Sequence, residues 1–191
     1  GEGGQYKDEE LVDIFLHPQD RAYSVQDVLD LVAGADLMFQ GWHDNGLYYR
    51  DANIDPNSVL AQRLAGVSEE DEWSAVDDFK LHNIQHNFMA RHKTDSPRWR
   101  IDFDGNDWLT YRPAPHPALK ALGNGSFQRG SSNFSLGAQQ QMLLQACDGQ
   151  TSIATLAGKL TEPEATADKR ALSRAFFRIM WRLGHVFFKT A

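Results

Sequence analysis

The chain has 191 residues, of which 41% are hydrophobic and 24% charged. This composition belongs to a globular protein with one sizeable core or two small ones, and it excludes disorder along the whole length. The sequence has no apolar run near the roughly 20 residues that cross a bilayer, and its start lacks the basic and apolar parts of a signal peptide. We therefore expect a cytoplasmic protein with no membrane partner.

Charge is divided unevenly along the chain, whose formal net charge is −7. Residues 1–134 contain 12 lysines and arginines against 22 acidic residues, whereas residues 135–191 contain 7 against 4. The difference predicts two modules, of which only the second suits an anionic partner. The start, Gly1–Glu2–Gly3–Gly4, resembles the remnant of a tag or linker and predicts excision from a longer chain. The single cysteine, Cys147, is interpreted as a small core residue.

Helix signals dominate the first module. Ser24 and Asp27 form a capping-box pair at the start of a helix, and Gly34 is the expected stop. The aromatic and apolar residues 37–42 follow as a short strand.

Two further helices are predicted after this strand. Asp55 offers an N-cap with Pro56 at the first helical position. Ser68 caps a third helix, whose acidic first turn complements the helix dipole and whose apolar stripe continues to Phe88.

Residues 99–111 change to a period of two, which predicts a β-hairpin around a polar turn at 104–107. Its aromatic residues form either the core side of the hairpin or an exposed platform that stacks on a ligand: Trp99, Phe103, Trp108 and Tyr111. Three prolines within 112–117 remove N–H donors and should prevent a further ladder. The glycine-, serine- and asparagine-rich residues 123–134 are predicted to be a loop and the domain boundary.

The last module shows three helical patterns followed by a strand. Ser135 is expected to cap the first helix, Asp148–Gly149 to form the turn after it, and residues 185–189 to form the strand. This order matches a winged helix, although only one wing strand is visible. The fold prediction is thus α+β, with a mainly helical module carrying a short hairpin (1–122) and a winged-helix-like module (135–191).

One run of residues carries a family resemblance, and it is followed by an aromatic-rich strand and a histidine-containing stretch. The run comprises His17, Pro18, Asp20, Arg21, Tyr23, Ser24 and Val25. It resembles the segment that follows the nucleotide-binding fold in bacterial class I S-adenosylmethionine-dependent methyltransferases with a regulatory domain. Ala35–Asp36–Leu37 departs from the family's Ala-Gly-Leu turn, and the stretch 82–88 is similar to the family's His-x-Phe region.

The resemblance covers residues 10–92 well and 135–191 more loosely, through the Asp-Gly turn of small winged-helix domains. It implies a methyltransferase whose S-adenosylmethionine domain lies upstream. No glycine-rich strand–turn–helix unit of the kind that binds this cofactor occurs in the sequence. We expect the chain to contain no catalytic, cofactor-binding or metal-binding residue, and to be an accessory part that contacts the upstream domain, the substrate or another protein.

Two histidine patterns have competing interpretations. His82 and His86 lie four apart on the predicted third helix, near His92, a spacing that can bind zinc. Because the pattern lacks an orienting carboxylate and a well-placed third ligand, helix packing or surface polarity is preferred and no tightly bound zinc is expected. His17 with Asp20 could serve acid–base chemistry, but an Asx turn or ion pair before Ser24 is the simpler interpretation.

Four arginines recur every fourth residue along the third helix of the last module: Arg170, Arg174, Arg178 and Arg182. Such a ridge is either a solvated face, a surface that docks on an acidic protein region, or a contact to nucleic acid. We expect contact with protein, including the acidic residues 69–72 of this chain, because the net charge disfavours nucleic acid. A winged-helix nucleic-acid or transcription-related module is the alternative function.

Overall fold

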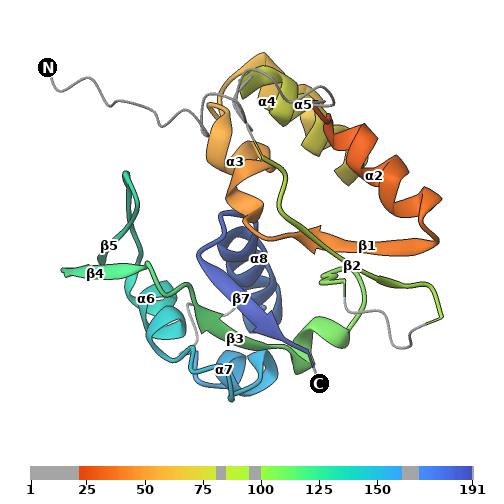
Figure 1. Ribbon diagram of the computed structural model, residues 1–191. Helices are drawn as coiled ribbons and strands as arrows, with labels where there is room; N and C mark the ends of the chain where they lie inside the picture. Colours follow the sequence, from red (N-terminus) through yellow and green to blue (C-terminus); the bar gives the residue numbers. More distant parts are fainter. Residues whose placement is uncertain (1–21, 81–84, 95–99, 161–167, 191) are drawn as a thin grey trace, which may run out of the picture.

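The computed structural model describes residues 22–80, 85–94, 100–160 and 168–190. It confirms the α+β class, since helices pack with small antiparallel sheets (Figure 1). The motif residues His17, Pro18, Asp20 and Arg21, together with His82 and Trp99, lie outside the described residues. Helix α8 and strand β7 lie between the group formed by α2 to α5 and the pair α6 and α7 (Figure 1).

The described helices are α2 (Val25–Gly34), α3 (Arg50–Asn53), α4 (Val59–Leu64), α5 (Glu69–Lys80), α6 (Ala138–Gln145), α7 (Ile153–Gly158) and α8 (Lys169–Arg182), with 3-10 turns η1 (Asn45–Leu47) and η2 (Asp107–Thr110). The described strands are β1 (Leu37–Trp42), β2 (Phe88–His92), β3 (Arg112–Pro115), β4 (Lys120–Gly123), β5 (Ser126–Arg129), β6 (Ser132–Ser135) and β7 (Val186–Lys189). They form the antiparallel pairs β1–β2 and β3–β7 and the three-stranded sheet β4–β5–β6.

The start of the first module follows the sequence prediction. The Ser24 hydroxyl accepts a hydrogen bond from the Asp27 amide at 3.2 Å, and the Asp27 carboxylate accepts from the Ser24 amide at 3.0 Å. Helix α2 ends at Gly34 and β1 begins at Leu37, as expected. Asp36 has φ 58°, the left-handed conformation that glycine adopts most easily, so this turn forms with aspartate where the resembling family has glycine.

The predicted second and third helices need correction. Helix α4 begins after Ser58 instead of at Pro56, because the Asp55 side chain turns the backbone locally by accepting from the Asn57 amide at 2.9 Å. Helix α5 starts after Ser68 as expected, but Phe88 lies in β2 opposite Trp42. Strand pairing and aromatic packing therefore override the helical period of the sequence near Phe88.

The predicted hairpin at 99–111 is wrong for the described residues 100–111, where η2 replaces a second strand. Phe103, Trp108 and Tyr111 all enter one core cluster with α6, α7 and α8, so they do not alternate between two faces. The Tyr111 hydroxyl holds the turn by accepting from the Asp102 amide and donating to the Asp102 carbonyl, both at 3.1 Å.

The prolines do take part in a ladder, contrary to the sequence prediction. Strand β3 pairs with β7, with Pro113 opposite Phe188. The Pro113 carbonyl accepts from the Gly149 amide at 2.8 Å. In a strand, the N–H and C=O of one residue point to the same side. The side of Pro113 that lacks an N–H donor therefore faces Gly149 and not β7. An edge position thus tolerates the proline.

The predicted loop at 123–134 contains strands of the sheet β4–β5–β6. Asn124 and Gly125 have φ values of 50° and 77°, which is the Asn-Gly signature of a tight hairpin. Phe127 of this sheet is buried in the same cluster as Phe176 and Phe177 of α8. Ser135, expected to cap α6, belongs to β6, and α6 follows Gly137. The two-module division itself stays a prediction.

The order of three helices and a strand in the last module is present as α6, α7, α8 and β7. Asp148–Gly149 forms the expected turn, with Gly149 at φ 68° and the Asp148 side chain accepting from the Gln150 and Thr151 amides at 2.7 Å. The partner of β7 is β3, which precedes the three helices. One strand follows α8 in the described residues, so the winged-helix assignment stays a prediction.

A glycine at the end of α8 allows three distant segments to meet. Gly184 has φ 70°, and a Cβ atom there would lie 2.6 Å from Asp44 Oδ1 and 2.9 Å from Arg129 Nη1. Arg129 of β5 pairs with Asp44 at 2.5 Å and donates to the Leu183 carbonyl at 3.1 Å. The absence of a side chain at Gly184 is therefore required for this ion pair.

We predict that Gly184→Ala lowers the free energy of unfolding by about 2 kcal/mol more than Gly130→Ala. Gly130 is a matched control, because it has a φ of 58° but no heavy atom within 4 Å of the point where a Cβ atom would lie. Urea unfolding of both variants measures the difference. Equal losses would show that backbone conformation alone, and not the Asp44–Arg129 contact, requires glycine at Gly184.

His185, the residue after Gly184, makes the free energy of unfolding depend on pH. Its ring is buried and stacks on Phe134 with centroids 4.5 Å apart, and its Nδ1 has no hydrogen-bond partner in the described structure. Burial, reinforced by the charge of Arg129, lowers the pKa of His185 to about 4. The unfolded state therefore binds a proton more readily than the folded state, and stability falls as the pH drops from about 6.5 toward 4.

We predict that His185→Phe, which retains an aromatic ring against Phe134, reduces the decline in unfolding free energy between pH 7 and pH 5. Urea unfolding at several pH values gives this slope for each protein. His92→Gln removes an exposed histidine as the control and should leave the slope near that of the parent. A His185→Phe slope equal to the parent slope would contradict the assignment.

Candidate functional site: a polar cleft beside helix α8

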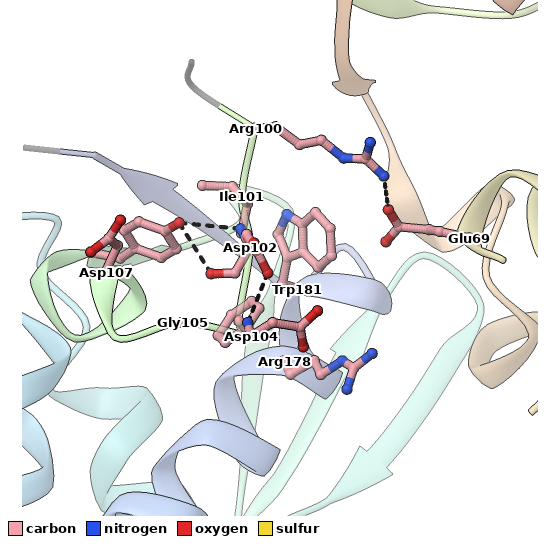
Figure 2. Close-up of a pocket in the computed structure, with 11 residues that line it drawn as sticks. Glu69, Arg100, Ile101, Asp102, Asp104, Gly105, Asp107, Arg178 and Trp181 are labelled. Atoms are coloured by element: carbon pink, nitrogen blue, oxygen red, sulfur yellow. Dashed lines mark hydrogen bonds and ion pairs between the residues drawn. The ribbon is translucent and has the colours of Figure 1, made fainter. Parts of the chain in front are cut away.

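A cleft of about 640 Å³ opens where α8, the N-terminus of α5 and residues 100–111 meet (Figure 2). Its volume lies within the range of roughly 300–1,000 Å³ that is common for small-molecule sites. Aromatic side chains and charged groups line it together, so it offers both an apolar surface and hydrogen-bonding groups. We take this cleft as the candidate functional site.

Helix α8 supplies one wall of the cleft. Asp168 caps its N-terminus by accepting from the Arg170 amide at 2.8 Å, and Phe176, Phe177 and Met180 anchor its apolar side in the core. This anchoring directs Arg178 and Trp181 to the cleft, since residues three apart share a helix face. Arg178 is exposed and makes no ion pair with the described residues.

Trp181 is half-buried and packs against two hydrophobic core clusters, one in the first module and one beneath α8. Its ring lies 5.5 Å from that of Tyr49 and 6.0 Å from that of Phe103, centroid to centroid. One contact comes from the residue that precedes α3 and the other from the 100–111 segment. They hold the indole in place while part of it faces the cleft (Figure 2).

Residues 100–107 form the opposite wall. The Asp102 carboxylate accepts from the Asp104 amide at 2.7 Å in an Asx turn, which fixes the path of the backbone. The Tyr111 hydroxyl bridges the backbone of Asp102, and burial raises the pKa of Tyr111 so that the bridging proton is retained. Asp102, Asp104 and Asp107 are exposed along this wall.

Glu69, the first residue of α5, closes the end of the cleft. Arg100 forms an ion pair with its carboxylate (Figure 2). The Tyr49 hydroxyl donates to the same carboxylate at 2.5 Å. Burial and the Glu69 charge raise the pKa of Tyr49 well above its usual value, so that its hydroxyl remains a donor. Both carboxylate oxygens of Glu69 therefore have a partner within the chain.

A buried ion-pair network supports the cleft from beneath. Arg182, 7% exposed, pairs with Glu72, 3% exposed, and its Nε donates to Asp51 at 2.5 Å. The guanidinium also lies over the Tyr49 ring, 4.2 Å from the centroid. Glu72 accepts in addition from the Arg50 amide at 3.0 Å. The network joins α3 and α5 to the end of α8.

We predict that Arg182→Gln lowers the free energy of unfolding by about 3 kcal/mol, because it leaves the buried Glu72 and the more exposed Asp51 with fewer positive partners. Arg174→Gln is the matched control, since it removes an exposed pair with Asp104 and should cost at most about 1 kcal/mol. Chemical denaturation compares the two. Similar small losses in both variants would contradict a supporting role for the buried network.

The structure separates the four arginines of the predicted ridge. Arg182 is buried in the network, Arg174 pairs with Asp104 at 3.3 Å, and Arg170 donates to Asn106 and lies over the Trp108 ring. Their partners all lie within residues 1–122, and one of them, Glu72, belongs to the acidic residues 69–72 that were expected to contact the ridge. Arg178 alone of the four extends without such a partner among the described residues.

The other predicted residues have mainly structural surroundings. His86 lies outside the described helix, contrary to expectation: its Nδ1 is 2.9 Å from Tyr48 Oη, and its Nε2 donates to the Tyr23 carbonyl at 2.8 Å. His92 is exposed at the end of β2. Cys147 is buried, and burial raises the pKa of its thiol to about 12. In the described ranges, no three histidine, cysteine or acidic residues are grouped to hold a metal.

Of the two alternatives for the aromatic residues of 99–111, the core role holds for the described ones and the exposed platform does not: Phe103, Trp108 and Tyr111 are all at most 6% exposed. The sequence did not single out the cleft residues Arg100, Asp102, Asp107 and Trp181 as a site. The density of acidic residues in 102–107 was the available signal, but their proximity to α8 depends on tertiary packing. None of the helices in the described part of the chain has the length and apolarity to cross a membrane. No family model matches the sequence.

Proposed function

We propose that the chain is an accessory, non-catalytic region of an S-adenosylmethionine-dependent methyltransferase, and that its cleft beside α8 takes part in substrate recognition. The observation that carries the recognition role is the cleft itself, in which exposed charged groups surround the fixed indole of Trp181. The assignment to a methyltransferase rests on the sequence resemblance. The cofactor belongs to a domain upstream of residue 1 in this proposal.

Most of the described residues that carry the resemblance support structure in the first module. Val25, Trp42 and Tyr48 belong to one buried cluster, and the Trp42 and Tyr48 rings stack with centroids 3.8 Å apart. Phe39 and Phe88 pack against this cluster. A pattern of this type indicates a shared fold more than shared chemistry. Recognition is therefore assigned to the cleft and not to the motif residues.

The geometry favours an accessory role over nucleic-acid reading by α8. In a winged-helix protein, the third helix would present its polar side chains to a major groove. Three of the four ridge arginines of α8 instead contact residues of this chain. Their positive charges are partly neutralised by these contacts, which reduces the attraction of the helix for a phosphate backbone.

We predict that the natural polypeptide that includes the sequence preceding residue 1 binds S-adenosylmethionine, whereas this chain alone does not. Isothermal titration calorimetry of both proteins checks this, with micromolar affinity expected for the longer polypeptide only. A longer polypeptide without measurable affinity would contradict the methyltransferase assignment, and micromolar binding by this chain would contradict its accessory role.

The recognition role has a separate test in the longer polypeptide. Asp102→Asn combined with Asp107→Asn should reduce methyl transfer from labelled S-adenosylmethionine to an extract of the source cells by at least half, while cofactor affinity stays unchanged. Asp78→Asn removes an exposed carboxylate of α5 as the control. Unchanged transfer by the double variant would show that the cleft does not contact the substrate.

A further inference from the structure

We infer that the cleft beside α8 binds a basic side chain, a guanidinium or ammonium group of a partner peptide segment, with Trp181 as its aromatic surface and Asp102 and Asp107 as its carboxylates. This inference rests on the proposed recognition role of the cleft and adds the chemical class of the ligand. Its support is the way in which the chain places its own cations next to aromatic rings around the cleft.

Two arginines near the cleft show a repeated arrangement of ring, cation and carboxylate. Arg100 lies 5.6 Å from the Trp73 ring centroid and pairs with Glu69. Arg182 lies 4.2 Å from the Tyr49 ring centroid and pairs with Glu72. Each guanidinium is within the ~6 Å at which the negative face of an aromatic ring attracts a cation. In both cases a carboxylate neutralises the charge at the same time.

The third arginine has a related arrangement with a neutral acceptor. Arg170 lies 5.9 Å from the Trp108 ring centroid and donates to the side chain of Asn106. Each of the three rings, those of Trp73, Tyr49 and Trp108, thus has a guanidinium of this chain over it.

Trp181 is the partly exposed aromatic residue of the cleft, since Phe103 and Tyr111 are buried, and no cation lies over its ring among the described residues. Its ring contacts are to Tyr49 and Phe103, and no guanidinium lies over its face in the described structure. Asp102 and Asp107 are exposed on the facing wall, and neither forms an ion pair with a described residue. The cleft therefore contains a ring and two carboxylates without the cation that the neighbouring sets possess.

The charge of the lining also favours a cation. Four carboxylates and two guanidiniums line the cleft. Arg100 is committed to Glu69, and Asp104 is paired with Arg174 at 3.3 Å. Among the described lining residues, this leaves Asp102, Asp107 and Arg178 without an ion-pair partner, so the uncommitted charges of the cleft are two negative and one positive. Among the described lining residues, an anionic ligand would have Arg178 as its uncommitted cation, and the negative charges of Asp102 and Asp107 would repel it.

The experiment is a titration of this chain with a blocked nine-residue peptide that repeats Gly-Arg-Ser three times, followed through the tryptophan indole N–H signals in two-dimensional NMR. The Trp181 signal, assigned by its loss in Trp181→Phe, should shift more than those of the buried Trp42 and Trp73. We expect a dissociation constant of about 0.1–1 mM at 20 mM salt that weakens at 200 mM salt. The same peptide with glutamate in place of arginine is the probe for an anionic ligand.

Charge variants test whether the cleft prefers a cation or an anion. Asp102→Asn with Asp107→Asn should weaken binding of the arginine peptide at least about threefold, whereas Arg178→Gln should strengthen it by about two- to fivefold, because a like charge is removed. As controls outside the cleft, Asp78→Asn removes one exposed negative charge and Lys120→Gln removes one exposed positive charge, and each should have a smaller effect per charge removed. All of these positions are on the surface, so thermal unfolding of each variant readily confirms that it is folded.

Two results would overturn the inference. One is an arginine peptide that leaves the Trp181 signal in place or binds the aspartate variants as well as it binds the parent. The other is a shift of Trp181 by the glutamate peptide that Arg178→Gln abolishes, which would show an anion site. Both outcomes are independent of cofactor binding by the longer polypeptide, so a failed peptide titration leaves the methyltransferase assignment to its own calorimetric test.

Discussion

The buried ion pair between Arg182 and Glu72 is the contact on which the arrangement of the rest depends. It places the last residue of α8 against α5, although the two residues are 110 positions apart in the chain. Removing two charges from water is costly, and the cost is offset here by additional donors and acceptors from Asp51, the Arg50 amide and the Tyr49 ring. Such a contact tolerates little displacement, and so it sets how α8 lies on the first module.

The cleft is a direct consequence of that placement. With its end held by Arg182, α8 presents Trp181 to Tyr49 and Phe103, and Arg178 to the acidic wall at 102–107. The same wall is fixed by Tyr111, whose hydroxyl bridges the Asp102 backbone. The site therefore draws on both predicted modules, and neither contains it alone.

The aromatic residues divide into two roles because of their burial. Trp42, Tyr48 and Trp73 pack against one another in the first module, and Phe103, Trp108 and Tyr111 fill the core beneath α8. Trp181 lies between these two clusters and is only partly covered. Its intermediate position gives the molecule one fixed aromatic surface beside charged groups, and this combination suits the cleft to recognition of a ligand that has both apolar and charged parts.

Local signals in the sequence determined the elements whose stability is local. The Ser24 and Asp27 capping box and the Ser68 cap fix helix boundaries through neighbouring backbone groups, and the predictions from them are confirmed. Tertiary structure decided the segments whose backbone partners are distant. The 112–115 segment became a strand because β7 and Gly149 pair with it, and Phe88 left the helical pattern because it pairs opposite Trp42. The arginine spacing likewise predicted one ridge, but only packing decided that Arg182 is buried with Glu72 while Arg178 faces the cleft, since periodicity specifies a face and not what covers it.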